Sequence, residues 1–391
     1  MLVQSNIPET KDVLSRVDWE FPRATTPPYS IHALHWFPGN FIPQIPKYLI
    51  EVLSAEGDLI LDPFCGSGTT GVEATLLNRQ AILSDVNRSS LTVSKAKSAM
   101  LSDGAVQNEL EIFARTIAWD AVIDFENTPN HSKAHREALA NWYHPSTLSE
   151  LDYLWSLIEK YNGSKTYWVL QMIFSNVLFA CASTKGAETK TGRKRQHHWG
   201  WVADNVLPKP PVLHAPIKAF RDKIFETINS IRSIEKRAFQ PFSILRQDAR
   251  KLGIKNNSID LIVTSPPYIG MIDYTRANRL HYAWMEWDLN EREGEIGARY
   301  KRQRKNIVEQ YLSDMQSCAL ELSRVLKPGG YCAIIIGASR SFAGTDTEVL
   351  KIIERYLVRT WGPKERVPTR RRVSNKEGTS SSEYICVFRK E

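Results

Sequence analysis

The chain has 391 residues, of which 42% are hydrophobic and 24% charged, values that are ordinary for a globular protein. A formal net charge of +8 favours a polyanionic partner such as nucleic acid, although charge alone specifies none. Its five cysteines are scattered and never spaced as CxxC, which argues for a reducing compartment and against a structural zinc, and we expect no bound metal. The first residues contain neither an apolar signal core nor a membrane-spanning run, so we expect a cytoplasmic protein that does not contact membranes.

Residues 1–53 precede the first predicted strand and contain no strand pattern themselves. Residues 1–30 are polar and interrupted by prolines, and we expect an arm across the surface. The next segment, HALHWFPGN, contains Phe37 and Pro38 and leads into residues 41–53, whose apolar side chains recur at helical spacing.

The stretch LILDPFCGSGTT, residues 59–70, predicts a buried strand, a sharp turn and the start of a helix. The apolar run ends at Asp62 and Pro63, since proline has no amide hydrogen for a strand ladder. Gly66 and Gly68 allow the backbone to turn tightly and to approach a ligand closely. Such a turn at the carboxyl edge of an open sheet is a typical cradle for a small molecule, although a glycine turn alone is weak evidence.

A second strand, AILS, ends at Asp85, about twenty residues after the first glycine of the turn. An acid at this place can accept hydrogen bonds from the hydroxyls of a ribose. A loop acid or a helix cap is the alternative interpretation. We favour the ligand, because both features fall at strand ends of one unit.

After residue 100 the alternation of strands and helices stops, and periodic apolar residues predict a mainly helical insertion over residues 101–240. Within it, the segment KGAETKTGRKRQHHWGW is rich in basic and aromatic residues. Its cationic side chains suit contacts with phosphates, and the candidates are Lys190, Arg193, Lys194 and Arg195. A solvated loop is the bland alternative. The insertion is our candidate for target recognition.

The sheet pattern returns in residues 241–391, with Asp248 after a short strand and then the stretch SIDLIVTSPPY. The candidate catalytic residues of this stretch are Ser265, Pro266, Pro267 and Tyr268. The two prolines fix the backbone and remove two donors, so that their carbonyls only accept hydrogen bonds. A rigid row of acceptors beside an aromatic ring suits an exocyclic amino group on a planar base.

With the pair of motifs DPFCGSGTT and TSPPY, the chain resembles the S-adenosylmethionine-dependent DNA methyltransferases that modify amino groups. These enzymes make N4-methylcytosine or N6-methyladenine, and the resemblance implies a place in a restriction–modification system. The resemblance implies an α/β Rossmann-like fold: a mostly parallel seven-stranded sheet with helices on both faces. It covers about residues 30–100 and 244–390. The catalytic domain is therefore expected in two parts, 31–100 and 241–391.

The resemblance also assigns roles to residues. The cofactor S-adenosylmethionine would be held by residues from four segments: Phe37, Pro38, Asp62, Pro63, Phe64, Gly66, Gly68, Thr69, Asp85 and Asp248. The SPPY residues would hold the amine of a base flipped out of the duplex. Serine at the first position of this clamp favours cytosine N4 over adenine N6. The insertion precedes Asp248, whereas the family commonly places its recognition region after that acid, so its role stays open.

The expected partner is double-stranded DNA, together with a cognate restriction endonuclease, and one chain would suffice as a monomer. Further basic residues, Arg302, Arg304 and Arg371, are candidates for DNA contact. Three other functions stay open: methylation of adenine N6, methylation of RNA amino groups, and a silent DNA-binding subunit. A nucleotide-binding dehydrogenase ranks lowest, because it would leave SPPY unexplained.

Overall fold

One eight-stranded sheet organises the fold, with strands in the order β3-β2-β1-β4-β5-β8-β6 and with β7 paired to β8. The structure is a computed structural model and describes residues 12–19, 21, 30–40, 42–117, 137, 139–182, 211–234, 239–337, 339, 341–362, 367–370 and 380–391. The strands are β1 (Leu59–Asp62), β2 (Gln80–Asp85), β3 (Ser243–Arg246), β4 (Ile259–Thr264), β5 (Leu326–Gly337), β6 (Val358–Trp361), β7 (Val367–Arg370) and β8 (Ser380–Arg389).

The first five strands are parallel, and β8 runs antiparallel to its neighbours β5, β6 and β7. The seven strands along the main path confirm the predicted Rossmann-like α/β class. The eighth strand, β7, pairs with β8 outside this path and is additional to the seven strands expected. Since β1, β2, β3 and β4 are parallel, the turns that follow them meet at one edge of the sheet.

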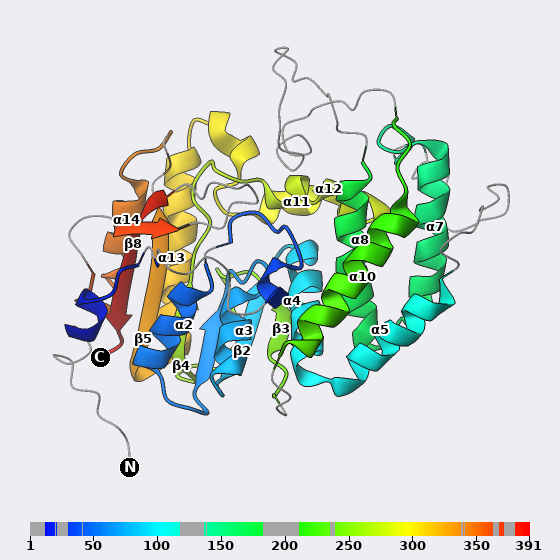
Figure 1. Cartoon of the computed structure of the whole chain (residues 1–391). Helices are drawn as coiled ribbons and strands as arrows, with labels where there is room; N and C mark the ends of the chain where they lie inside the picture. The colour runs from blue at the N-terminus through cyan, green and yellow to red at the C-terminus, as the bar shows by residue number, and fades with distance from the viewer. Residues whose placement is uncertain are drawn as a thin grey trace.

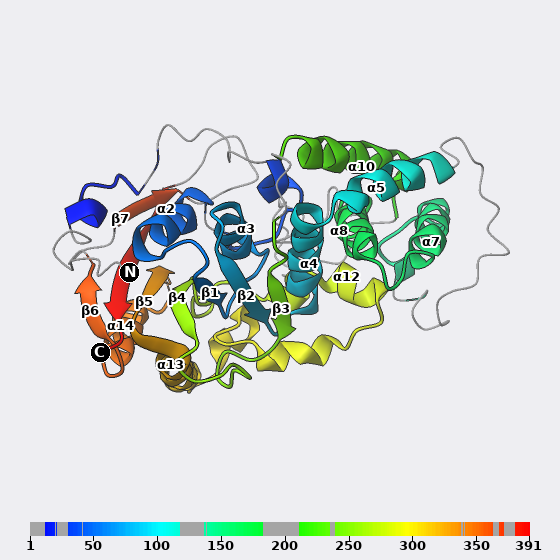
Figure 2. The same ribbon diagram turned by 90° about the horizontal axis from the view of Figure 1, so that it is seen from below.

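Helices cover both faces of the sheet, because successive side chains of a strand point to opposite sides. On β5, Ala333 and Ile335 belong to one hydrophobic core, and Cys332 and Ile334 belong to the other. Figure 2 shows α2, α3 and α4 on one face, and α13 and α14 on the other. These helices are α2 (Gln44–Leu53), α3 (Thr69–Leu76), α4 (Arg88–Ser102), α13 (Ile307–Val325) and α14 (Thr345–Ile353).

A group of helices stands beside the sheet and fills the described part of residues 101–240 (Figure 1). Helix α8 packs against α4 and thereby joins this group to the sheet domain. The helices confirm the predicted helical character of the insertion, and its use in target recognition stays a prediction. They are α5 (Gly104–Thr116), α7 (Pro145–Glu159), α8 (Lys165–Ala180) and α10 (Pro216–Arg232).

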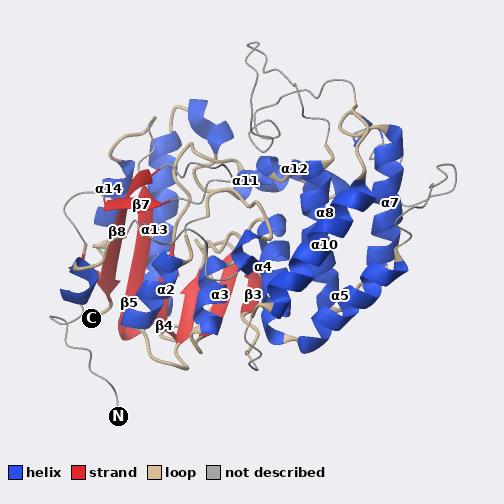
Figure 3. Cartoon of the chain, in the orientation of Figure 1, coloured by secondary structure: helices blue, strands red, loops and turns tan. Residues whose placement is uncertain are grey.

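Short helical segments lie above the carboxyl edge of the sheet, between β4 and α13 (Figure 3). They are α11 (Tyr274–Ala277), α12 (Arg279–Trp284), η3 (Leu289–Gly294) and η4 (Arg299–Gln303), and η1 (Ser30–Ala33) precedes α2. Among the described helices, none combines the length and the apolar character needed to cross a membrane.

Candidate active site

The turn after β1 has a left-handed backbone at both of its glycines, with φ of +48° at Gly66 and +78° at Gly68. Residues with a side chain rarely adopt this conformation. A Cβ atom on Gly68 would lie 2.8 Å from Oγ of Ser94 on α4, so the turn rests directly against that helix. Helix α3 begins at the next residue, Thr69. The turn thus brings β1 and α3 together as the sequence predicts.

Asp62 closes β1 and is buried behind the turn. Its Oδ1 accepts a hydrogen bond from Thr264 Oγ1 at 2.6 Å, and its Oδ2 accepts one from Thr70 Oγ1 at 2.8 Å. Burial raises the pKa of Asp62 to about 6, although hydrogen bonds from Thr264, Thr70 and the amide of Phe64 oppose the shift. Asp62 therefore joins the ends of β1 and β4, and does not line the cavity described below.

Asp85 closes β2 and connects two backbone segments. Its Oδ2 accepts a hydrogen bond from the amide of Gly66 at 3.0 Å, and its Oδ1 accepts one from the amide of Asn87 at 2.9 Å. Burial raises the pKa of Asp85, against the opposing effect of these two amides. The carboxylate thus holds the glycine turn at a fixed distance from β2 while it faces the cavity.

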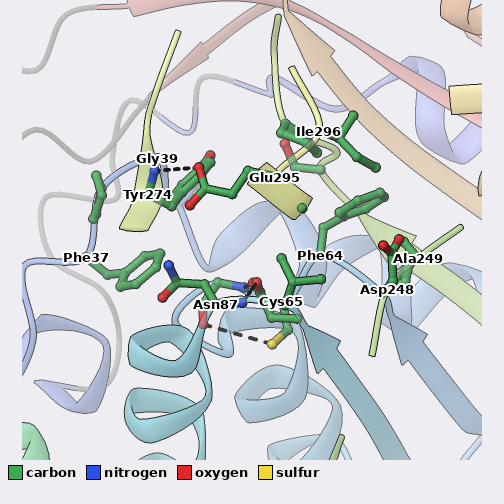
Figure 4. A pocket seen from close by; sticks show the side chains of 18 of the residues that line it. Phe37, Gly39, Phe64, Cys65, Asn87, Asp248, Ala249, Tyr274, Glu295 and Ile296 are labelled. Atoms are coloured by element: carbon green, nitrogen blue, oxygen red, sulfur yellow. Dashed lines mark hydrogen bonds between the residues drawn. The ribbon is translucent and has the colours of Figure 1, made fainter. Parts of the chain in front are cut away.

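A cavity of about 810 Å³, which includes the space at its open mouth, lies above these strand ends. Figure 4 shows Phe37 and Asp248 on opposite sides, with Glu295 and Ile296 across from Asn87 and Cys65. Most of the residues predicted to hold the cofactor meet here: Phe37, Pro38, Pro63, Phe64, Gly66, Thr69, Asp85 and Asp248. Gly68 packs against α4 and does not line it. The structure therefore gathers eight of these ten residues around one space, and puts Asp62 and Gly68 behind its wall.

The lining of this cavity is acidic and aromatic. Among the described residues that line it are three acids, Asp85, Asp248 and Glu295, and no lysine or arginine. Burial raises the pKa of Glu295 to about 8, with a further contribution from the nearby Asp273. Phe37 stacks on Tyr274, with the ring centroids 6.2 Å apart. With this pKa, Glu295 is largely protonated and neutral at neutral pH, so the acids that can give the lining negative charge are Asp85 and Asp248. Negative charge without a cation among these lining residues disfavours phosphate-bearing ligands and suits a ligand that carries a positive charge.

Asp248 lines the cavity opposite Phe37 and is paired with Arg250, whose Nη2 lies 2.6 Å from its Oδ2. Burial alone would raise the pKa of Asp248. The hydrogen bonds and charge of Arg250 outweigh burial, so the net pKa lies below its ordinary value. Arg250 also donates to Asp314 on α13 at 2.9 Å and to the carbonyl of Gly294 at 3.1 Å. Asp248 thus stays ionised, held by an arginine that ties the cavity wall to α13.

The four residues of the SPPY segment follow β4 and are divided between two adjoining cavities. Ser265 and Pro267 line the large one. Ser265, Pro266 and Tyr268 line a smaller cavity of about 300 Å³. Both cavities share three residues at their boundary, namely Gly39, Ser265 and Tyr274. A ligand in the large cavity and a planar ring in the small one would therefore meet at Ser265.

Several lining residues have no strong signal in the sequence. Asn40 accepts a hydrogen bond from Ser67 Oγ at 2.9 Å and so connects the segment before α2 to the glycine turn. Glu295 accepts hydrogen bonds from the backbone amides of Tyr274 and Thr275. Its segment has neither strand nor helix periodicity, so only the fold shows that it reaches the cavity. Gln247 is adjacent to the predicted Asp248 and could have been found from that position.

Two of the basic residues predicted to contact nucleic acid are described. Arg302 is exposed, donates to Ser341 Oγ at 2.7 Å and lies beside Gly270, two residues after Tyr268. Arg304 is exposed and pairs with Glu293 at 3.1 Å. Arg302 therefore borders the segment that follows the SPPY residues. The others lie outside the described residues and stay predictions: Lys190, Arg193, Lys194, Arg195 and Arg371.

Comparison with known proteins gives curated relatives with low identity over long alignments. The chain is 20% identical over 391 residues to the Type II methyltransferase M.MjaII of Methanocaldococcus jannaschii, covering 80% of this chain and 72% of that protein. It is 24% identical over 278 residues to the Type II methyltransferase M.MvaI of Kocuria varians, covering 66% and 58%. The chain thus spans less than two thirds of the second relative.

Solved structures resemble the chain only distantly. The rRNA methyltransferase aviRa of Streptomyces viridochromogenes is 12% identical with a TM-score of 0.36, covering 95% of both chains. A likeness at this level adds nothing to the sheet order described above.

The family comparison covers more of the site. A model described as DNA methylase, of the N6 and N4 type, matches residues 4–96 and 259–391, which together are more than half of the chain. The matched parts contain the glycine turn, Asp85 and the SPPY segment, and they leave out the whole helical insertion as well as Asp248. The chain therefore belongs to the N6/N4 DNA methylase family.

Proposed function

We propose that this DNA methylase moves the methyl group of S-adenosylmethionine to the exocyclic amino group of a base flipped out of double-stranded DNA, and that the base is cytosine, methylated at N4. The observation that carries the proposal is the pair of adjoining cavities that meet at Ser265. One suits a cationic cofactor, and the other suits a planar base.

The residues around the large cavity fit S-adenosylmethionine. Asp85 would accept hydrogen bonds from the ribose hydroxyls, and Phe37 and Phe64 offer apolar surface. Asp248 would accept from the amino group of the adenine. Asp85 and Asp248, with no cationic side chain among the described lining residues, favour a sulfonium ion.

The small cavity supports a base as the acceptor. Its walls include the rings of Tyr268 and Tyr274, which can stack on a flipped base. Ser265 stands where both cavities join. Serine at this position favours cytosine N4, whereas adenine N6 stays the alternative acceptor. RNA is a second alternative, which the family match makes less favoured than DNA.

Methylation of an exocyclic amino group calls for hydrogen-bond acceptors beside its nitrogen. The lone pair of an exocyclic amine is delocalised into the ring, so the nitrogen is a poor nucleophile. Ser265 Oγ and the backbone of Pro266 would accept its hydrogens and favour a pyramidal nitrogen. When bound, the cofactor supplies an electrophilic methyl group. The chain's own residues contribute positioning and electrostatics, and no covalent bond to the enzyme is required.

The Type II relatives support a place in a prokaryotic restriction–modification system, with a companion endonuclease that the methylation blocks. Such a system acts on DNA in the cytoplasm. Residues of one chain line both cavities, so a monomer would suffice. Light scattering of the purified protein would test the monomer, and digestion of methylated DNA by the companion nuclease would test the pairing.

Methyl transfer from radiolabelled S-adenosylmethionine tests the function directly. We expect label in duplex DNA and none in RNA of the same sequence. Ser265→Ala is expected to lower kcat at least tenfold, because it removes the acceptor at the amine. Ser258→Ala is the matched control, since its hydroxyl donates to a surface carbonyl at the start of β4. Equal rates for Ser265→Ala and the wild-type protein would contradict the proposal.

A further inference from the structure

The ring of Tyr268 is held from behind by a carboxylate that the sequence does not single out. Glu383 lies on β8 and is buried, although it is polar. The hydroxyl of Tyr268 donates a hydrogen bond to Glu383 Oε1 at 2.8 Å. The two residues are 115 positions apart, so only the antiparallel strand of the sheet brings them together.

The strand β5 leaves room for this contact. Gly337, which pairs with Glu383 across the two strands, faces the tyrosine ring. A Cβ atom at Gly337 would lie 2.7 Å from Cε2 of Tyr268 and 3.2 Å from Cγ of Glu383. Any larger residue would therefore displace the ring or the carboxylate.

The direction of this hydrogen bond determines what Ser265 can do. A carboxylate only accepts hydrogen bonds, so the hydroxyl hydrogen of Tyr268 is used on Glu383. The oxygen of Tyr268 lies 3.4 Å from Ser265 Oγ, and with its own hydrogen engaged it can act there only as the acceptor. A hydrogen bond between the two hydroxyls therefore uses the hydrogen of Ser265, which leaves the lone pairs of Ser265 Oγ to accept.

We propose that Glu383 is a positioning residue that fixes the polarity of the amine clamp through the chain Ser265–Tyr268–Glu383. The inference rests on the proposed function. An exocyclic amine presents two hydrogens and needs acceptors. A serine that turned its own hydrogen toward the amine would instead bind the nitrogen lone pair, the electrons that must attack the methyl group. Glu383 prevents this orientation from a distance, without touching the base.

A double-mutant cycle on kcat tests the proposal. Glu383→Met removes the acceptor, which frees the Tyr268 hydroxyl to donate to Ser265 and reverses the chain. We expect kcat to fall about tenfold, the size of one misdirected hydrogen bond, while KM for DNA and the Kd of S-adenosylmethionine stay within about twofold. Tyr268→Phe removes the reversed donor, so the double variant is expected to be no slower than Glu383→Met alone.

Glu383→Gln is the conservative variant, because its amide oxygen still accepts from Tyr268. It is expected to keep kcat within about threefold of the wild-type value, and to have no effect in the Tyr268→Phe background. If Glu383→Met does not fold, this second pair carries the test. Glu348→Gln is the matched control, since Glu348 pairs with Lys351 at an exposed place on α14 and its substitution should leave kcat unchanged.

The proposal would be overturned if Glu383→Met and Tyr268→Phe lowered kcat by independent factors that multiply in the double variant. It would also be overturned if the kcat of Glu383→Met equalled the wild-type value. A third contradicting result would be that Glu383→Gln lowers kcat by the same factor in the wild-type and the Tyr268→Phe backgrounds. These outcomes presuppose a wild-type protein that transfers methyl groups. Absence of any transfer by the wild-type protein would instead contradict the proposed function itself.

Discussion

Asp62 and Thr264 stand 202 positions apart in the chain, yet their side chains share a hydrogen bond of 2.6 Å. Asp62 ends the strand that leads into the glycine turn, and Thr264 ends the strand that leads into the SPPY segment. The bond therefore fixes the cofactor cradle and the amine clamp relative to each other. In-line transfer between two ligands depends on such a fixed distance.

Asp62→Ala should damage both halves of the site together. It removes the acceptor of the Thr264 hydroxyl and of the Phe64 amide, and it leaves the Thr70 hydroxyl with only the carbonyl of Val263, at 3.3 Å. We expect a loss of about 2–4 kcal/mol in the free energy of unfolding, measured by urea titration, because unsatisfied buried donors are costly. Calorimetry should show weaker binding of S-adenosylmethionine.

The matched control for this variant is Asp58→Ala, because Asp58 directly precedes Leu59, the first residue of β1. Asp58 accepts a hydrogen bond from the amide of Ala55 at an exposed site, so its loss should change the free energy of unfolding by less than about 1 kcal/mol. Equal losses in the two variants would show that Asp62 has no special part in the link.

Asp85→Asn tests the acid at the end of β2. One of its two oxygens becomes an amide nitrogen, which faces a backbone donor of Gly66 or Asn87. We expect the affinity for S-adenosylmethionine to fall roughly tenfold to a hundredfold, as for a lost hydrogen bond to a charged group. Asp103→Asn is the control, because asparagine also caps a helix well at its place before α5. An unchanged Kd for Asp85→Asn would remove Asp85 from the cofactor site.

The features of the site that are formed by neighbouring residues could be predicted from the sequence. The contacts between residues far apart in the chain could not. Residues 59–70 carry their strand, turn and helix signals in direct succession, so the turn and Asp85 were predicted at the places where the structure has them. Asp62 matched a motif, but a motif does not say whether a side chain faces a cavity or a neighbouring strand. Glu295 and Glu383 reach the site only through tertiary structure, and nothing in their local sequence indicates it.

Gly337→Ala should slow the reaction by displacing the ring of Tyr268. The added methyl group would lie 2.7 Å from Cε2 of that ring, closer than real contacts allow. We expect a free energy of unfolding lower by about 1–3 kcal/mol and a reduced kcat, measured by urea titration and by methyl transfer. Gly104→Ala is the control, since no heavy atom lies within 4 Å of its added Cβ. A full kcat for Gly337→Ala would mean that the ring need not stay in place.

Glu73→Gln should change how stability depends on pH. Glu73 on α3 is buried and lies 2.6 Å from Nε2 of His32. Burial raises the pKa of Glu73 from its ordinary 4.5 to about 8. A carboxyl group with a raised pKa stabilises the fold below its ordinary pKa, and this contribution is lost as the pH rises through 8.

Between about pH 5 and 8, the free energy of unfolding of the wild-type protein should therefore fall relative to that of Glu73→Gln, by about 1.4 kcal/mol for each pH unit. Urea titrations of both proteins at three pH values in this window would measure the difference. Parallel curves would show that Glu73 ionises as easily in the folded protein as in the unfolded one.

The most direct test of the central claim is mass spectrometry of nucleosides from duplex DNA incubated with the protein and methyl-labelled S-adenosylmethionine. The account predicts labelled N4-methylcytosine, made by the wild-type protein and much reduced in Ser265→Ala. Labelled N6-methyladenine would keep the two cavities and their chemistry and contradict the choice of base. Label on a ring carbon of cytosine, or no labelled nucleoside at all, would contradict an amine clamp at Ser265.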